Sequence, residues 1–188
     1  TLTPKRSEFF AGDIIFLGDM PRSALSDRFC ELTEEFVGEF GGGLIVIAGP
    51  RFGPGELAGT EIAKMLPVDV DPTARLRDQR EFLPELTFEG QTEPFMRLGD
   101  GESDEENLTA WRNMGPLPWY QPVQAVHGQA VVLAEHPVDV CADGRTKQPL
   151  IAVRRYGKGR VVYLGFNEMW RLRRKHGELY YRQFWSQV

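Results

Sequence analysis

A short run of residues near the C-terminus has the composition of a catalytic turn. Gly165–Glu168, with the sequence GFNE, follows an apolar segment, and the end of such a strand is where an α/β enzyme displays a catalytic side chain. Asp19 and Arg51 follow the apolar runs Asp13–Gly18 and Leu44–Ala48 in the same way. Because the carboxyl ends of parallel strands meet at one edge of a sheet, we expect these side chains to line one crevice.

The residues expected to line this crevice bring charge, an amide and one aromatic ring to it. They are Asp19, Arg51, Phe52, Asn167, Glu168 and Arg171. Arg51 stands beside a glycine-rich loop and is suited to grip a carboxylate or phosphate. The alternative is a structural ion pair between Arg51 and either Asp19 or Glu168.

Two kinds of catalysis are open to these residues. Asp19 and Glu168 would serve as an acid–base pair for hydrolysis of a sugar or an amide, since glycosidases hold such carboxylates about 5 to 9 Å apart. Nucleophilic catalysis needs a serine or cysteine on a sharp turn, and neither G-x-S-x-G nor G-x-C-x-G occurs. Cys30 and Cys141 are expected to be buried thiols, although their spacing leaves a disulfide open, and only an exposed thiolate beside positive charge would react.

The sequence predicts neither a cofactor nor a metal. Gly53–Ala58 is formally G-x-G-x-x-A, but Pro54 removes a backbone donor that pyrophosphate would need. The acidic run 100–106 lacks the glycine and the final carboxylate of a calcium loop, so we expect a solvated loop. His127, His136 and His176 are expected at the surface or in loops.

Composition limits the classes of function. The chain has 188 residues and a net charge of −5, which suits one domain and argues against nucleic acid as a partner. No stretch approaches the ~18 apolar residues of a membrane span. Since the chain begins at Thr1 without methionine or signal peptide, we expect it to be a fragment of a longer protein, and its localisation cannot be read from its ends.

The first third of the chain reads as a strand, a helix and a strand. Asp13–Gly18 is a continuous apolar run, which predicts a strand buried on both faces. Ser26 is a suitable N-cap for a helix reaching about Phe40, whose apolar residues recur three or four apart. Three glycines end the helix before the second buried strand, Leu44–Ala48. This order with short connections predicts a parallel βαβ unit.

The rest of the chain is predicted as one domain, 1–188, in which 67–148 is an elaboration. Alternating patterns and turn residues predict the remaining elements. They are a helix at Thr60–Leu66, strands at Leu86–Glu89, Phe95–Leu98 and Ala130–Ala134, a helix at Glu105–Asn113 capped by Ser103, a hairpin of Pro149–Tyr156 and Arg160–Gly165, and an aromatic helix at the C-terminus.

Two long stretches together resemble a known family. Asp13–Val68, with GGGLIVIAG and MLPV, and Pro149–Trp185, with YGKGRVVYLG, are similar to glutamine amidotransferase-like domains of large bacterial membrane-associated proteins of the planctomycete type, as is EPFMRL at Glu93–Leu98. The resemblance implies the class I glutamine amidotransferase-like fold. This is a flavodoxin-like three-layer α/β sandwich with a mostly parallel sheet, here with an inserted α+β middle section and a C-terminal β-hairpin. It also implies a soluble fragment of a membrane-anchored bacterial protein.

The chain departs from this family at the catalytic positions. Active members carry a cysteine on the turn after a central strand, and a histidine and glutamate in a segment of the form G-x-Q-F-H-P-E after a late strand. Here the first turn reads Gly49–Phe52 (GPRF), and Asn167 stands about where the histidine belongs. Without a thiolate and an imidazole, glutaminase chemistry is lost.

The sequence therefore favours a degenerate domain with no catalytic residue. It would act as a binding or assembly module of a larger bacterial envelope-associated protein. Its partners would be the other domains of that protein and a small anionic or sugar ligand, with no nucleic acid and no membrane span in the fragment. The alternative is the hydrolase that uses Asp19 and Glu168.

Overall fold

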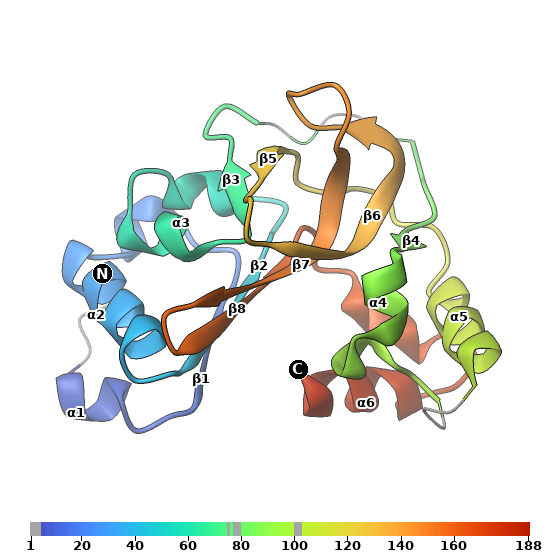
Figure 1. Ribbon diagram of the computed structural model, residues 1–188, viewed down its shortest axis with the longest axis horizontal. Coiled ribbons are helices and arrows are strands. Elements are labelled where there is room, and N and C mark those ends of the chain that lie inside the picture. The colour runs from blue at the N-terminus through green and yellow to red at the C-terminus, as the bar shows by residue number, and fades with distance from the viewer. Residues whose placement is uncertain (1–4, 75, 77–79, 100–102) are drawn as a thin grey trace.

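The computed structural model describes residues 5–74, 76, 80–99 and 103–188 (Figure 1). Within them, a six-stranded sheet has the order β1-β2-β8-β7-β6-β4. Its strands are β1 (Ile14–Leu17), β2 (Gly43–Ile47), β8 (Gly159–Leu164), β7 (Lys147–Tyr156), β6 (Val131–Val140) and β4 (Glu85–Leu86). Parallel pairing joins β1 to β2 and β2 to β8, and antiparallel pairing joins the others. The sheet is therefore mixed, with its parallel part at the βαβ end.

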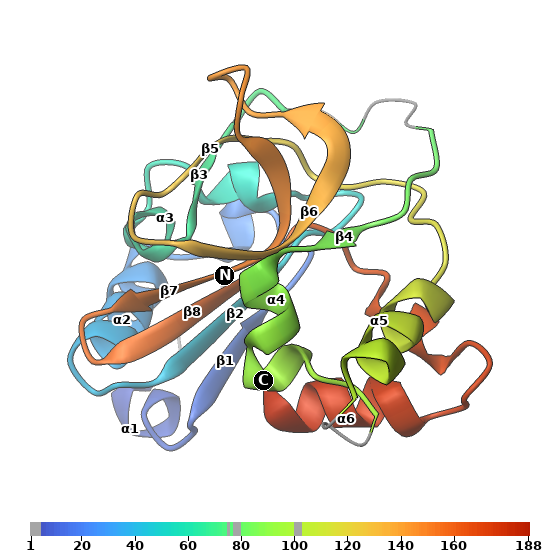
Figure 2. The same cartoon turned by 45° about the vertical axis from the view of Figure 1, so that its right-hand side comes forward.

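Helices cover both faces of this sheet, so the predicted α/β sandwich is confirmed (Figures 1 and 2). The helices are α1 (Arg6–Phe9), α2 (Asp27–Gly38), α3 (Glu61–Met65), α4 (Phe88–Thr92), α5 (Asp104–Asn113) and α6 (Leu179–Gln187). Alternate residues of β2 face two separate cores, as a strand requires. Leu44 and Val46 pack with residues of α2 and α3, whereas Ile45 packs with residues of α5 and α6.

The predicted βαβ unit is present, with two corrections. Ser26 caps α2 by accepting the Phe29 N–H at 3.0 Å. The helix ends at Gly38, so Phe40 leaves the expected apolar stripe and is 61% exposed. Burial of β1 on both faces was also wrong: Phe16 is 55% exposed, because β1 is the edge strand of the sheet.

The middle section contains more structure than the sequence predicts. The expected strand at Leu86–Glu89 is wrong beyond Leu86, where Thr87 caps α4 by accepting the Gly90 N–H. The expected strand at Phe95–Leu98 is a 3₁₀ turn, Pro94–Met96, which begins at a proline. Ser103 caps α5 as predicted, and residues 100–102 of the acidic run lie outside the described ranges.

Two antiparallel features complete the fold. A second sheet pairs β3 (Val68–Val70) with β5 (Val123–Val126). The predicted hairpin is β7 and β8, and Gly157 takes a φ of +55° at its tip. In the part of the chain that the structure describes, no helix has the length and apolarity needed to cross a bilayer.

One histidine lies in the interior instead of at the surface. His136 is 7% exposed on β6, and its ring lies 4.2 Å from that of Phe82 and 4.9 Å from that of Tyr120, centroid to centroid. Its Nδ1 accepts the N–H groups of Val138 at 3.1 Å and Asp139 at 2.8 Å. The expectation of a surface or loop residue was wrong here, because the bend of β6 at this point folds the backbone over the ring.

This geometry makes the stability of the fold depend on pH. Burial lowers the pKa of His136, and nearby Lys147 adds to this, against Asp139 and Glu85. The unfolded chain therefore binds the proton more readily, so stability is full above about pH 6.5 and declines as the pH falls below it. Urea unfolding at pH 7.5 and 5.5 should show this loss in the wild type. A smaller loss is expected in His136→Gln, whereas His176→Gln, at an exposed site, should match the wild type. An equal loss of stability in the wild type and both variants would contradict this role of His136.

Candidate functional site

Asp19 holds the loop that follows β2 against the end of β1. Its Oδ1 accepts the N–H of Phe52 at 2.5 Å, and its Oδ2 lies 3.4 Å from Nε of Arg51. A Cβ on Gly49 would overlap the Asp19 carboxyl group, so the loop approaches this closely only with glycine there. The structure thus brings Asp19, Arg51 and Phe52 together, and Arg51 forms the structural ion pair that the sequence left as an alternative.

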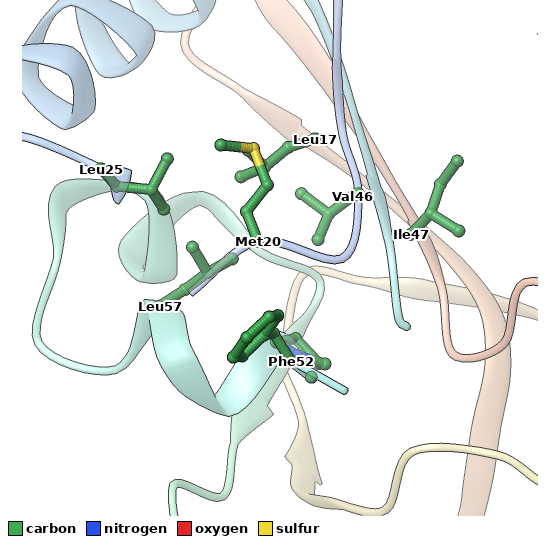
Figure 3. Close-up of a pocket in the computed structure, with 10 residues that line it drawn as sticks. Leu17, Met20, Leu25, Val46, Ile47, Phe52 and Leu57 are labelled. Carbon is green, nitrogen blue, oxygen red and sulfur yellow. The ribbon is translucent and has the colours of Figure 1, made fainter. Parts of the chain in front are cut away.

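The ring of Phe52 belongs to the packing beneath this loop. Figure 3 shows it near Met20 and Leu57, at the edge of an apolar recess. The recess has a volume of about 10 Å³, which is room for about one water molecule. A ligand has no space there, so Phe52 contributes its backbone N–H to the loop and its ring to the wall of this small recess.

At the end of β8, two of the expected crevice residues are tied to each other. Nε of Arg171 lies 2.6 Å from Oε2 of Glu168, and the two side chains are 12% and 14% exposed. Arg171 also donates to the carbonyl oxygen of Pro116 at 3.1 Å and stacks over Trp170. Asn167 is exposed, and within the described residues its side chain makes no hydrogen bond. The pair therefore links the turn after β8 to the segment after α5.

Both carboxylates that would serve a hydrolase are thus engaged by arginines. Oδ1 of Asp19 also accepts the backbone N–H of Phe52, which fixes the position of the carboxylate in the loop. These contacts describe structural roles for Asp19 and Glu168.

The two thiols are free and buried, so they form no disulfide. Burial raises the pKa of Cys30, and burial together with Asp143 raises the pKa of Cys141 to about 11. Both side chains therefore remain protonated near neutral pH and lack the thiolate that nucleophilic attack needs. Cys30 lies within α2 and Cys141 directly follows β6, away from the Gly49–Phe52 turn in the chain.

A surface pocket of about 370 Å³ opens beside Arg51. It lies between the loop after β2 and the segment after β3. Its lining consists of Gly49, Pro50, Arg51, Gly53, Gly55, Glu56, Pro72, Ala74, Leu76 and Gln121. The Arg51 side chain is 75% exposed, and Glu56 accepts the N–H of Arg22 at 2.7 Å. This pocket, which we call the Gln121 pocket, has a size that suits a small ligand.

Gln121 is the functional candidate that the sequence did not reveal. The residue is 5% exposed, and its N–H donates to the carbonyl oxygen of Gly165 at 2.7 Å, where β8 ends. Its side chain lines the pocket and lies so close to Gly53 that a Cβ there would overlap the amide. Among the residues that the structure describes, this amide has no hydrogen-bond partner. An amide that lines a pocket and makes no hydrogen bond within the fold is available to a ligand there.

The glycine loop and the acidic residues offer little to a cofactor or metal. A Cβ on Gly55 would meet the carbonyl oxygen of Asp71 at 2.8 Å, so this glycine serves close packing of two segments. Residues 54–57 form a 3₁₀ turn. In the described ranges, no cluster of three histidine, cysteine, aspartate or glutamate side chains is arranged to hold a metal ion.

Comparison with known proteins places the fold without assigning an activity. No protein-family model matches the chain, and no curated protein matches it either. Among solved structures, it is similar to "Cytoplasmic Protein STM1381" of Salmonella typhimurium LT2, with a TM-score of 0.68, 20% identity, and coverage of 100% of this chain and 74% of that one. STM3548 of Salmonella typhimurium gives a TM-score of 0.66, 17% identity and the same coverages.

A third similar structure is part of a much larger enzyme. Gan42B, a GH42 β-galactosidase of G. stearothermophilus, matches with a TM-score of 0.53 and 14% identity over 89% of this chain, which corresponds to 21% of the enzyme. At these identities the likeness concerns the fold alone. The chain therefore shares its α/β architecture both with proteins of similar size and with one segment of a glycosidase.

Proposed function

We propose that this chain is a non-catalytic binding module that takes a small anionic or sugar ligand in the Gln121 pocket. The observation that carries the proposal is the Gln121 amide, which lines the pocket and makes no hydrogen bond to the described residues. Arg51 adds a charge at the rim. Only its Nε faces Asp19, and its two Nη groups make no hydrogen bond within the described residues.

These two side chains suit a ligand with hydroxyl groups and a negative charge. A primary amide offers one acceptor and two donors, which match the hydroxyl groups of a sugar. A guanidinium with free Nη donors binds carboxylate or phosphate oxygens in a forked geometry. A sugar acid carries both kinds of group and is the simplest probe of the pocket.

We also propose that the module is a degenerate glutamine amidotransferase-like domain with a flavodoxin-like core. Support comes from the β1-α2-β2 unit with β8 beside it, and from the turn after β2, where Arg51 and Phe52 stand in place of a cysteine. In this proposal the chain is one part of a larger envelope-associated protein, whose other domains are its partners. The hydrolase alternative gains nothing from Asp19 and Glu168, since both are held in ion pairs.

The test compares gluconate with glucose by isothermal titration calorimetry. We expect gluconate to bind more tightly than glucose, because only gluconate engages the Arg51 charge. Gln121→Leu should weaken the binding of both ligands by about fivefold, which corresponds to the loss of an ordinary hydrogen bond. Arg51→Gln should weaken the binding of gluconate by about tenfold. Arg28→Gln, at an exposed site on α2, removes the same charge elsewhere and is the matched control.

Two results would overturn the proposal. One is a titration in which neither gluconate nor glucose binds, or in which Arg28→Gln weakens gluconate binding as much as Arg51→Gln does. The other is release of ammonia from glutamine by the purified chain, since this requires a covalent acyl intermediate that the described turn after β2 has no thiol to form.

A further inference from the structure

A second pocket is lined by residues from the start of β6 and from the β7–β8 hairpin. Its volume is about 490 Å³. We call it the arginine pocket. It is lined by Glu93, Gln129, Val131, Val153, Arg154, Arg155 and Arg160. None of these residues lines the Gln121 pocket. Three arginines against one glutamate is an unusual local charge in a chain whose net charge is −5.

Arg154 is buried without a carboxylate. It is 9% exposed, and no carboxylate of the described residues lies within ion-pair distance of it. Its Nη1 donates to the carbonyl oxygens of Lys64 at 2.8 Å and Leu66 at 3.2 Å, and its Nη2 to Oε1 of Gln129 at 3.2 Å. Its Nε is buried and has no hydrogen-bond partner in the part of the chain that the structure describes. A buried guanidinium is unfavourable unless its charge and its donors are compensated.

The other two arginines face each other across the hairpin. Arg155 on β7 is paired directly with Arg160 on β8 in the strand register. Like charges in this relation destabilise a sheet. Arg160 is balanced by Glu93, at 2.7 Å, whereas Arg155 is exposed and forms no ion pair with any described residue. An anion between these side chains would remove the repulsion.

We propose that the arginine pocket binds the phosphate group of a phosphate monoester. Guanidinium groups bind phosphate oxygens through paired N–H donors, and the side chains of Arg155 and Arg160 lie side by side on one face of the hairpin, where both can reach one anion. The side-chain N–H₂ of Gln129 supplies a further neutral donor. Val131 and Val153 give the pocket an apolar wall on which the organic part of the ester would lie. The inference rests on these contacts and is independent of the Gln121 pocket.

The experiment titrates the chain with phenyl phosphate and with inorganic phosphate at constant ionic strength, with chloride as the reference anion. Arg155→Gln removes an exposed charge whose side chain forms no hydrogen bond or ion pair with the described residues, so the variant should fold. We expect Arg155→Gln to weaken the binding of phenyl phosphate by about tenfold, as the loss of a charged hydrogen bond does. Arg145→Gln, an exposed arginine in the loop after β6, removes the same charge and should bind as the wild type does.

The outcomes separate the possible ligands and the two sites. Tighter binding of phenyl phosphate than of inorganic phosphate supports an organic ester, and equal binding of the two supports recognition of the phosphate group alone. No binding beyond that of chloride, or equal weakening by Arg155→Gln and Arg145→Gln, would overturn the proposal. Gln121→Leu should leave phosphate binding unchanged, so failure at the Gln121 pocket does not affect this result.

Discussion

Alanine at position 90 is expected to destabilise the protein by about 3 kcal/mol, at the upper end of what overpacking produces. Gly90 lies in α4, and a Cβ there would overlap the carbonyl oxygen of Leu133 on β6. Backbone cannot move aside as a flexible side chain does. The neighbouring Thr87 fixes the approach, since its N–H donates to the Leu133 carbonyl at 3.1 Å and its hydroxyl to that of Val132 at 2.7 Å. The substitution therefore forces α4 away from the sheet.

Urea unfolding of Gly90→Ala against Gly128→Ala measures this effect. No atom of the described residues lies within 4 Å of a Cβ built at Gly128, and its φ is not positive, so that variant should stay within about 0.5 kcal/mol of the wild type. Similar midpoints for the two variants would show that α4 does not pack on β6 as closely as the structure has it.

Local signals in the sequence were sufficient for the βαβ unit. Ser26 caps α2, the spacing of Phe29 and Phe36 gives its buried stripe, and the glycines before Leu44 end it. Each of these signals acts within a few residues. The position of β1 at the edge of the sheet depends on the order of distant strands, which explains why the exposure of Phe16 could not be read from its apolar run.

The residues of the candidate site also fall into those that local signals predict and those that distant contacts place. The pairing of Asp19 with Arg51 was one of the stated alternatives, because both follow adjacent strands of a parallel unit. Gln121 gave no signal, since its position depends on a hydrogen bond to Gly165, 44 residues along the chain, and on contact with Gly53. The helix α4 (Phe88–Thr92) was missed because the short alternating run Leu86–Glu89 fits a strand as well as the start of a helix.

The polar side chains that follow β8 and β2 differ in how far they are paired within the fold. The β8 end carries a partly buried ion pair that joins Glu168 to Arg171 and, through Pro116, to the middle section. The β2 end carries an exposed arginine beside the Gln121 pocket. Polar groups that are already paired with each other serve the fold, and polar groups without partners are those that a ligand can recruit. This contrast is why the proposed ligand site lies at the β2 end.

Truncation of Phe184 to alanine is expected to be the most damaging single change, at about 3–5 kcal/mol. The side chain is fully buried on α6, and its ring centroid lies 5.9 Å from that of Phe95, 6.0 Å from that of Trp111 and 5.1 Å from that of Trp185. The ring thus joins α6 to α5 and to the 3₁₀ turn before it. Its loss leaves a cavity bounded by large rings that cannot easily close.

Leu179→Ala on the same helix is the matched control, because Leu179 is 59% exposed and its loss should change stability by about 0.5 kcal/mol or less. Urea unfolding of both variants, followed by tryptophan fluorescence, reports on the cluster directly through Trp111 and Trp185. If Phe184→Ala unfolded at the same urea concentration as Leu179→Ala, α6 would not be docked through this ring. The turn that carries Glu168 and Arg171 precedes α6 and packs against it, so the variant should also loosen that ion pair while leaving Arg51 and Gln121 in place.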